Sequence, residues 1–373
     1  MRRRGRRGVD SMRQEEQQEV RCGDESRVAV RRPVVVSASR RCDLPAFYAD
    51  WFFGRLRAGY SACRNPFNGR WSRISYEATR FIVFWSKNPA PLLARLDELH
   101  GRGLDCYVQY TLNDYVREEL EPGVPPLDRR METFLRLADR LGPERVIWRA
   151  DPLMISDRLG VEELLERTAR IGDRLHGATE RLVFSFADIA PYRKVRRRLD
   201  GTGGGWREWQ PEEMARWAAG LAELNGRWGF RLETCAEAAD LSAWDVEHGR
   251  CVDEALMARL AHDDQPLMEA LGLAVERDEP SLFGAEPVAD DRPVWSGDGV
   301  RVRRVRRRAA AGQRPGCGCA ASVDVGAYDT CPHGCVYCYA NTSAERVEAN
   351  RLRHAGRPDD ETLTGEVPDC GPK

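Results

Sequence analysis

Short apolar runs recur along the chain from about residue 33 onward. They are rich in β-branched and aromatic residues. Continuous runs of this kind are typical of strands that are buried on both faces of a parallel sheet. The pattern therefore predicts six strands, at residues 34–39, 81–88, 106–113, 146–152, 182–188 and 231–237.

Helical patterns separate these runs. Several of the intervening segments begin at a proline and end at a glycine, as helices often do. The expected helices lie at residues 89–103, 128–142, 161–175 and 211–229. Alternating strands and helices form parallel sheets. The expected fold class is therefore α/β, with a full or partial (β/α) TIM-like barrel over residues 33–275. A doubly wound sheet is the main alternative.

The segments around this core differ in composition. Residues 1–32 are polar and rich in arginine, which predicts a disordered extension. Residues 276–316 are acidic and rich in proline, which predicts a linker, and they include an arginine run at residues 301–308. Such a run is most often a solvated face, and a phosphate-binding patch is the alternative. We expect residues 317–341 to form a cysteine-rich cluster-binding segment that closes the barrel, followed by a tail at residues 342–373.

Composition narrows the possible functions. The 58 basic and 59 acidic residues nearly cancel, so the net charge supports neither nucleic-acid nor membrane binding. No apolar run approaches the roughly 18 residues that span a bilayer, and the N-terminus lacks the apolar stretch of a secretory signal. A cytoplasmic location is expected. There the twelve cysteines are better explained as metal ligands or buried thiols than as disulfides.

Three of these cysteines stand close together near the end of the chain. Cys331, Cys335 and Cys338 have the spacing C-x3-C-x2-C within the stretch TCPHGCVYCYAN. Thiolates at this spacing can hold three corners of a 4Fe–4S cluster and leave the fourth iron open to a substrate or cofactor. A structural zinc site needs four ligands, and His333 is the local candidate for the fourth. A cluster, a zinc ion and unligated thiols are the three alternatives.

The same loop resembles the radical-SAM signature, with the aromatic Tyr337 just before the third cysteine. The resemblance implies a 4Fe–4S cluster whose unique iron binds S-adenosylmethionine, with Tyr337 as a cofactor-binding residue. It also implies reductive cleavage to a 5′-deoxyadenosyl radical that abstracts hydrogen from a substrate. A reductant such as flavodoxin or ferredoxin would supply the electron.

The rest of the chain resembles a bacterial family known as domain of unknown function 1848. The stretches that carry the resemblance are SASRRCDLPAFYADWF, RNPFN, FWSKNP, WRADP, CGC and DVGAYDTCPHGCVYCYAN, across roughly residues 33–341. The family brings no known reaction with it. Radical-SAM enzymes carry the cysteine loop near the start of the barrel, whereas here it stands near the end, and a clear GGE-like block is absent. A circular permutation reconciles the two orders and predicts that the last strand, within residues 320–328, pairs with the first.

Each predicted strand ends in polar residues. In a (β/α) barrel, catalytic groups project from the carboxyl ends of the strands. Cations at these ends could clamp carboxylates or phosphates, and acidic residues could bind an amino group or orient those cations. The alternative is that each is an ordinary loop-facing residue, and Trp85 and Trp148 are expected in the core. The catalytic or substrate-binding candidates are Ser39, Arg40, Asp43, Lys87, Asn88, Gln109, Thr111, Arg149, Asp151, Ser185 and Glu233.

Four further cysteines suggest a second metal site. Cys317 and Cys319 form a C-x-C pair, Cys235 ends the sixth predicted strand, and Cys251 follows it. Four thiolates suit an auxiliary cluster or a structural zinc ion. The alternative is a buried core thiol at Cys235 and a helix-capping Cys251. The site requires the four sulfur atoms to lie within a few ångströms of a common centre.

Three functions are consistent with these patterns. The first is a radical-SAM-type iron–sulfur enzyme whose substrate the sequence does not identify. The second is a metal-stapled module that binds nucleic acid through the arginine run and the N-terminal arginines, without catalysis. The third is a zinc-dependent hydrolase that uses the strand-end carboxylates. Metal analysis of protein purified without oxygen separates iron from zinc.

Overall fold

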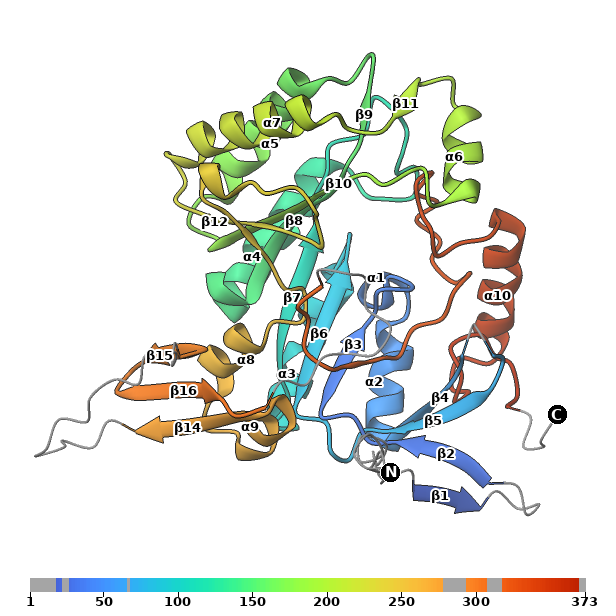
Figure 1. Cartoon of the computed structure of the whole chain (residues 1–373). Coiled ribbons are helices and arrows are strands. Elements are labelled where there is room, and N and C mark those ends of the chain that lie inside the picture. The colour runs from blue at the N-terminus through green and yellow to red at the C-terminus, as the bar shows by residue number, and fades with distance from the viewer. Residues whose placement is uncertain (1–17, 22–26, 66–67, 278–292, 307–316, 369–373) are drawn as a thin grey trace, which may run out of the picture.

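The computed structural model describes residues 18–21, 27–65, 68–277, 293–306 and 317–368. Its centre is a sheet of eight parallel strands, which confirms an α/β fold around a large parallel sheet (Figure 1). In spatial order the strands are β17 (Val323–Asp324), β3 (Val35–Ala38), β6 (Phe81–Ser86), β7 (Asp105–Thr111), β8 (Val146–Leu153), β10 (Arg181–Phe186), β12 (Arg231–Thr234) and β13 (Val246–His248).

The spatial order of the strands follows the chain with one exception. β17 comes last in the sequence but pairs in parallel with β3, the first strand of the sheet, with Val323 opposite Val36. This confirms the prediction that the last strand pairs with the first. β17 and β13 are the two edges of the sheet, and no pairing joins them within the described residues. The sheet is therefore open at that point, and the part of the chain that the structure describes contains no closed barrel.

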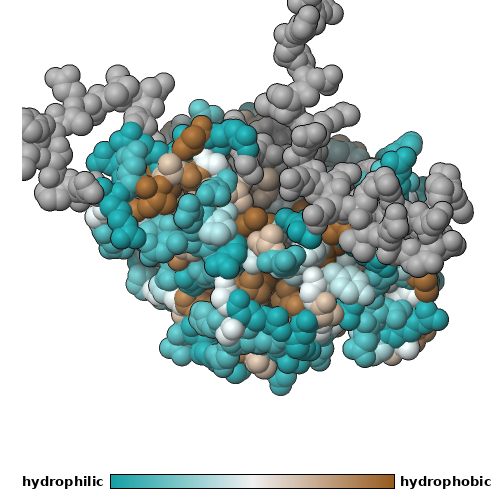
Figure 2. Space-filling view, turned by 90° about the horizontal axis from the view of Figure 1, so that it is seen from below, coloured by the Kyte–Doolittle hydropathy of each residue, from teal (hydrophilic) through white to brown (hydrophobic). Residues whose placement is uncertain are grey.

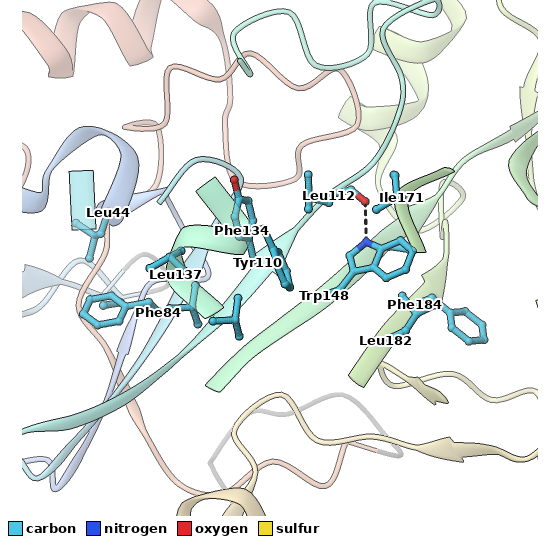
Figure 3. Packing of buried hydrophobic residues seen from close by; sticks show 14 of the residues in the cluster. Leu44, Phe84, Tyr110, Leu112, Phe134, Leu137, Trp148, Ile171, Leu182 and Phe184 are labelled. Carbon is cyan, nitrogen blue, oxygen red and sulfur yellow. Dashed lines mark hydrogen bonds between the residues drawn. The ribbon is translucent and has the colours of Figure 1, made fainter. Parts of the chain in front are cut away.

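Helices cover one face of the sheet. Strand residues such as Phe84, Trp148 and Phe184 face this layer and are fully buried. Figure 3 shows the packing around Trp148, whose indole Nε1 donates to the carbonyl of Leu112 at 3.1 Å. Trp148 is thus a core residue, as expected, whereas Trp85 is only half-buried. The covering helices are α2 (Ala49–Ala58), α3 (Leu96–Gly101), α4 (Leu127–Leu141), α5 (Val161–Leu175) and α7 (Pro211–Asn225).

A second, smaller layer covers part of the opposite face. Its apolar residues pack against side chains of the large sheet that include Val83, Tyr107 and Ile147. The layer therefore gives the sheet a second hydrophobic contact, and both faces of its central strands are buried. It consists of α8 (Glu254–Ala261), α9 (Gln265–Leu271) and the antiparallel strands β14 (Leu273–Arg277), β16 (Val300–Arg304) and β15 (Trp295–Gly297).

Part of the span predicted as a linker belongs to this second layer. Val300 and Val302 of β16 are buried in it, while Arg301 between them is exposed. The arginine run thus contains the period-two alternation of a half-buried strand. Arg303 forms an ion pair with Glu276 of the neighbouring strand at 3.0 Å. This arginine is therefore engaged within the fold, and the last two residues of the run lie outside the described residues.

A separate four-stranded sheet is formed by strands from the N-terminal part of the chain. Two of its strands, β1 and β2, fall in the span predicted as a disordered extension. The C-terminal tail reaches this sheet, because Ala62 N donates to Glu361 O at 2.7 Å. The strands are β1 (Gln18–Arg21), β2 (Arg27–Arg31), β5 (Trp71–Ser75) and β4 (Tyr60–Arg64). The remaining elements are α1 (Leu44–Phe47), β9 (Ile155–Ser156), α6 (Arg193–Asp200), β11 (Trp206–Arg207), the tail helix α10 (Ala344–Gly356) and the 3-10 helices η1 (Ala90–Arg95), η2 (Pro143–Arg145) and η3 (Ser242–Trp244).

The described helices give no sign of a membrane span. None of them is both long enough and apolar enough to cross a bilayer. Figure 2 shows the molecule from below, where hydrophilic residues predominate and apolar residues form small groups between them.

Candidate metal centre at the carboxyl edge of the sheet

The three-cysteine loop, residues 331–338, follows β17 and lies on the side of the sheet formed by the carboxyl ends of the parallel strands. The connection after β7 holds its backbone: Gly123 N donates to His333 O at 2.8 Å, and Val336 N donates to Leu120 O at 2.9 Å. A Cβ atom on Gly123 would lie 2.7 Å from the His333 carbonyl oxygen, so this close approach requires glycine. Long-range backbone contacts therefore fix the loop against the sheet.

The three thiols of the loop differ in exposure. Cys335 is buried, while Cys331 and Cys338 are half-buried. Burial raises the pKa of Cys331 well above its usual value and that of Cys335 to about 12, although Lys87 opposes the second shift. A thiolate in these surroundings therefore needs a cation beside it. As the side chains stand, no group of three or more His, Cys, Asp or Glu residues in the described part of the chain could hold a metal ion.

His333, the local candidate for a fourth ligand, is buried and fully engaged. Its Nε2 lies 2.7 Å from Asp43 Oδ2, and its Nδ1 lies 3.1 Å from the carbonyl oxygen of Gly123. Each ring nitrogen thus has an oxygen atom of the protein within hydrogen-bond distance. The ring also packs edge-on against Phe47, with the ring centres 4.6 Å apart. His333 therefore anchors the loop to the segment after β3 and has no nitrogen free for a metal.

Asp43 connects three elements at this edge. It caps α1 by accepting from Ala46 N at 3.0 Å, and it accepts from Ser86 Oγ at 2.6 Å and Lys87 N at 2.7 Å after β6. Burial alone would raise the pKa of Asp43, but His333, Ser86 and Lys87 together hold it below its usual value. The carboxylate is thus ionised and structurally occupied. Asp43, predicted as a strand-end candidate, joins β3 and β6 to the cysteine loop.

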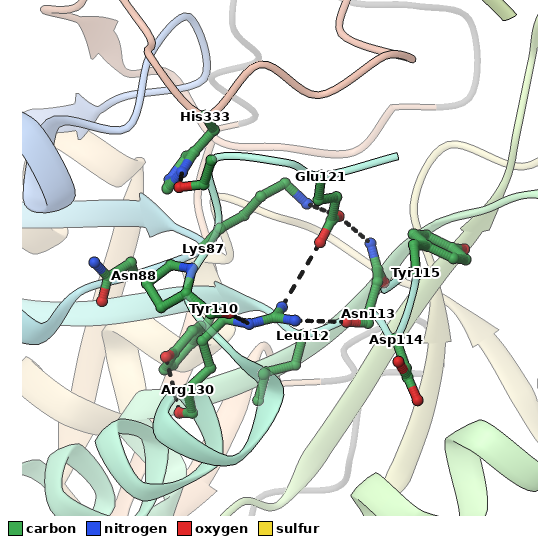
Figure 4. A network of polar contacts seen from close by, with 12 residues as sticks. Lys87, Asn88, Tyr110, Leu112, Asn113, Asp114, Tyr115, Glu121, Arg130 and His333 are labelled. Atoms are coloured by element: carbon green, nitrogen blue, oxygen red, sulfur yellow. Dashed lines mark hydrogen bonds and ion pairs between the residues drawn. The ribbon is translucent and has the colours of Figure 1, made fainter. Parts of the chain in front are cut away.

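A second buried network lies beside the loop (Figure 4). Lys87 Nζ is 2.9 Å from Glu121 Oε1 and 3.0 Å from the Tyr337 hydroxyl, which donates to the same carboxylate. Asn113 Nδ2 donates to Glu121 at 3.2 Å, and Arg130 Nη1 lies 3.7 Å from its other oxygen. Burial would raise the pKa of Glu121, yet Lys87 and Arg130 hold it below its usual value. The hydroxyl of Tyr337 is therefore turned into the protein, toward this ion pair.

Three members of this network, Asn113, Glu121 and Arg130, are not among the residues that the sequence pattern marked as candidates. Glu121 lies in the connection after β7, beyond the strand end that the pattern marks, and Arg130 lies on α4, where an arginine is usually solvated. The signal that could have found Glu121 is the short segment LEPG, because its Pro-Gly pair indicates a turn after the strand. No comparable signal marks Arg130.

Four strand-end candidates form a second cluster in the middle of the sheet, and Asn113 links it to the first network because its Nδ2 also donates to the Asp151 carbonyl oxygen at 3.3 Å. Arg149 donates through Nε to Asp151 at 3.2 Å and through Nη1 to Gln109 Oε1 at 3.2 Å. The same Nη1 lies 3.2 Å from the sulfur of Cys251. Ser185 donates to the other oxygen of Asp151. The structure thus brings Gln109, Arg149, Asp151 and Ser185 together, as their strand-end positions suggested.

Trp85 and the two residues that follow β3, Ser39 and Arg40, lie next to this cluster. The guanidinium groups of Arg40 and Arg149 each lie 5.2 Å from the Trp85 ring centre, which is cation–π distance. Ser39 Oγ donates to Asp324 of β17 at 2.7 Å, and Arg40 N donates to the same carboxylate at 2.8 Å. Ser39 and Arg40 are therefore tied to the strand that carries the cysteine loop.

Three strand-end candidates join neither group. Glu233 is buried in β12 and lies 3.0 Å from Arg231 and 3.6 Å from Arg181. Burial raises its pKa against the opposing charge of these arginines. Asn88 points away from the Lys87 network in Figure 4, and Thr111 is half-buried at the end of β7. The six strand ends therefore do not converge on one site.

A cavity of about 520 Å³ lies outside both groups, among β4, β5, α10 and residues 325–329. Arg41, Arg346 and Arg353 are among the residues that line it. None of the three loop cysteines lines it, so it is separate from the candidate metal centre.

A known protein family is similar to the chain over most of its length. The family described as a domain of unknown function, DUF1848, matches residues 35–340. This span runs from the start of β3 to just beyond the cysteine loop, so it covers the large sheet and both polar groups. No curated protein and no solved structure matches the chain. On the extent of that match, the chain belongs to the DUF1848 family.

Proposed function

We propose that the chain is an iron–sulfur enzyme of the radical-SAM type, in which the three loop cysteines hold a 4Fe–4S cluster. The observation that carries the proposal is the engagement of His333. Both of its ring nitrogens face acceptors, Asp43 and the Gly123 carbonyl, so the imidazole is not available as a fourth ligand. Three local thiols without a fourth local ligand suit a cluster with one open iron better than a closed zinc site.

The strand order supports the same proposal. Because β17 lies beside β3, the loop that follows β17 stands where the loop of a first strand would stand in an unpermuted sheet. The late position of the cysteines in the sequence is therefore compatible with the radical-SAM arrangement.

The chain's own residues would position the loop and balance its charge. With one electron from a reductant such as flavodoxin or ferredoxin, the bound cluster would cleave S-adenosylmethionine to methionine and a 5′-deoxyadenosyl radical that abstracts hydrogen from the substrate. Lys87 places a cation near Cys335 and so favours the thiolate there. Glu121 holds Lys87 at 2.9 Å, and the Tyr337 hydroxyl contacts both. Asp43 and Lys87 are the strand-end candidates that contact the loop.

Product formation tests this function. The protein is purified without oxygen, supplied with iron and sulfide, reduced with dithionite and incubated with S-adenosylmethionine. We expect 5′-deoxyadenosine and methionine in equal amounts, and neither from the Cys335→Ala variant. A loaded, reduced cluster that forms no 5′-deoxyadenosine would contradict the proposal.

His333→Ala is expected to leave the iron content largely unchanged while lowering stability. The change removes the contacts with Asp43 and the Gly123 carbonyl, and a hydrogen bond to a charged group such as the Asp43 carboxylate contributes about 1.5 to 3 kcal/mol. Iron per chain and urea unfolding of the same preparation check both parts. His100→Ala, at an exposed position of α3, is the matched control and should change neither. Release of zinc by His333→Ala would instead favour a four-ligand zinc site.

A further inference from the structure

Four cysteines from three separate segments meet on the side of the sheet that carries the second layer. Cys235 follows β12, Cys251 follows β13, and Cys317 and Cys319 lie in the segment that leads into β17. The sulfur atoms of Cys235 and Cys251 are 3.1 Å apart. Cys251 also contacts Cys319, and Cys319 contacts Cys317. All four are free thiols, and the structure thus brings together the four residues that the sequence suggested as a second site.

Backbone contacts hold these cysteines in place. Ala320 N donates to Val252 O at 2.9 Å, and Val252 N donates to the Cys319 sulfur at 3.4 Å. The carbonyl of Cys251 accepts from Gln109 Nε2 at 3.0 Å. Outer hydrogen bonds of this kind commonly orient metal ligands. The two halves of the group are therefore fixed to each other and to β7.

Two arginines place positive charge beside the sulfur atoms. Arg149 Nη1 lies 3.2 Å from the Cys251 sulfur, and the Arg40 guanidinium interacts electrostatically with Cys319, Cys251 and Cys317. Among the described residues, Arg40 Nε and Nη2 are buried and have no hydrogen-bond partner. Such buried donors are costly unless an anionic group faces them. Four thiolates and a divalent cation sum to −2, a charge that these two guanidinium groups offset.

We propose that Cys235, Cys251, Cys317 and Cys319 bind one tetrahedrally coordinated metal ion, and that this ion is zinc. Thiolates are soft ligands that zinc prefers. Zinc–sulfur bonds of about 2.3 Å place tetrahedral sulfur atoms about 3.8 Å apart, a spacing that thiols already in mutual contact reach by small movements. The side chains as they stand do not surround a metal position. Binding therefore turns the thiols from one another toward a common centre.

A metal ion at this site would link two parts of the sheet. Cys235 and Cys251 belong to the β12–β13 edge of the open sheet, whereas Cys317 and Cys319 lead into β17 at the opposite edge. A zinc ion there connects the two edges and fixes the start of the strand that carries the three-cysteine loop. This role goes beyond the proposed function and does not depend on it.

Metal analysis of loop-deficient protein tests the site by itself. In the Cys335→Ala background, which removes the proposed cluster, we expect one zinc ion per chain. Adding Cys251→Ser should reduce zinc to background, and so should Cys317→Ser at a half-buried position that is less demanding for folding. Cys106→Ser, at a buried thiol of β7 outside the group, is the matched control and should retain the zinc. Cobalt substitution should give the intense visible absorption of tetrahedral cobalt with four thiolates.

Three results would overturn the proposal. The first is the absence of zinc from the Cys335→Ala protein, with no tetrahedral cobalt spectrum. The second is iron with acid-labile sulfide at this group, lost on Cys251→Ser, which would indicate an auxiliary cluster. The third is a Cys235–Cys251 disulfide in protein isolated under reducing conditions. Each of these outcomes is independent of whether the three-cysteine loop forms 5′-deoxyadenosine.

Discussion

Replacing Cys331, Cys335 or Cys338 by alanine is expected to remove the iron–sulfur cluster completely. Three thiolates are the minimum for a cluster with one open iron, and the loop offers no substitute because His333 is engaged by Asp43. We expect iron to fall from about four atoms per chain to background in each variant. Iron, acid-labile sulfide and visible absorption of protein handled without oxygen measure the loss.

Cys63→Ala provides the control for this experiment. Cys63 is a half-buried free thiol on β4, outside both cysteine groups, and its replacement should leave the iron content unchanged. Full iron content in any one of the three loop variants would show that this cysteine is not a ligand.

Asp43→Ala is expected to cause the largest loss of stability. The change leaves the buried His333 without its carboxylate and removes the acceptor for Ser86, Lys87 N and the first turn of α1. Leaving a buried hydrogen-bonding group without its partner typically costs about 1 to 3 kcal/mol, and this change affects several such groups at once. Urea unfolding of both proteins measures the difference, and Asp50→Ala, which removes an exposed ion pair with Arg95 at the start of α2, should cost no more than about 1 kcal/mol. A difference of similar size for both variants would contradict the anchoring role of Asp43.

The stabilisation by Asp43 should also depend on pH. Its pKa is held below the usual value in the folded protein, so the unfolded chain binds protons more readily there. The contribution is therefore fully present above the unfolded pKa of about 3.9 and is lost as pH falls through the folded pKa. Unfolding measured across this range should show the difference between wild type and Asp43→Ala shrinking toward acid pH. A difference that grew on acidification would contradict the ionised state of Asp43.

The strands of the large sheet could be predicted because their side chains are buried on both faces. The run at residues 146–152 corresponds to β8, and the run at residues 81–88 contains β6. Pairing of the last strand with the first also followed from the sequence, through the resemblance of the cysteine loop. β16 was missed because its buried valines alternate with arginines, and the charge masked a strand of the second layer.

The site was only partly predictable, because its partners are distant in the sequence. The polar strand ends were visible as a pattern, yet only the folded chain separates the Lys87–Glu121 network from the Arg149–Asp151 cluster. The pairing of His333 with Asp43 joins residues 290 positions apart, and no local signal marks such a contact. The sequence could therefore identify candidate residues, but it could not show that several of them are hydrogen-bonded to other residues of the fold.

Electron paramagnetic resonance of the reduced protein, with and without S-adenosylmethionine, shows whether the three loop cysteines hold a cluster with an open iron. If Cys331, Cys335 and Cys338 hold a 4Fe–4S cluster with one open iron, the reduced protein gives a cluster signal that changes when S-adenosylmethionine is added. A cluster signal that S-adenosylmethionine leaves unchanged, or zinc in place of iron at these three cysteines, would contradict the proposed radical-SAM-type site.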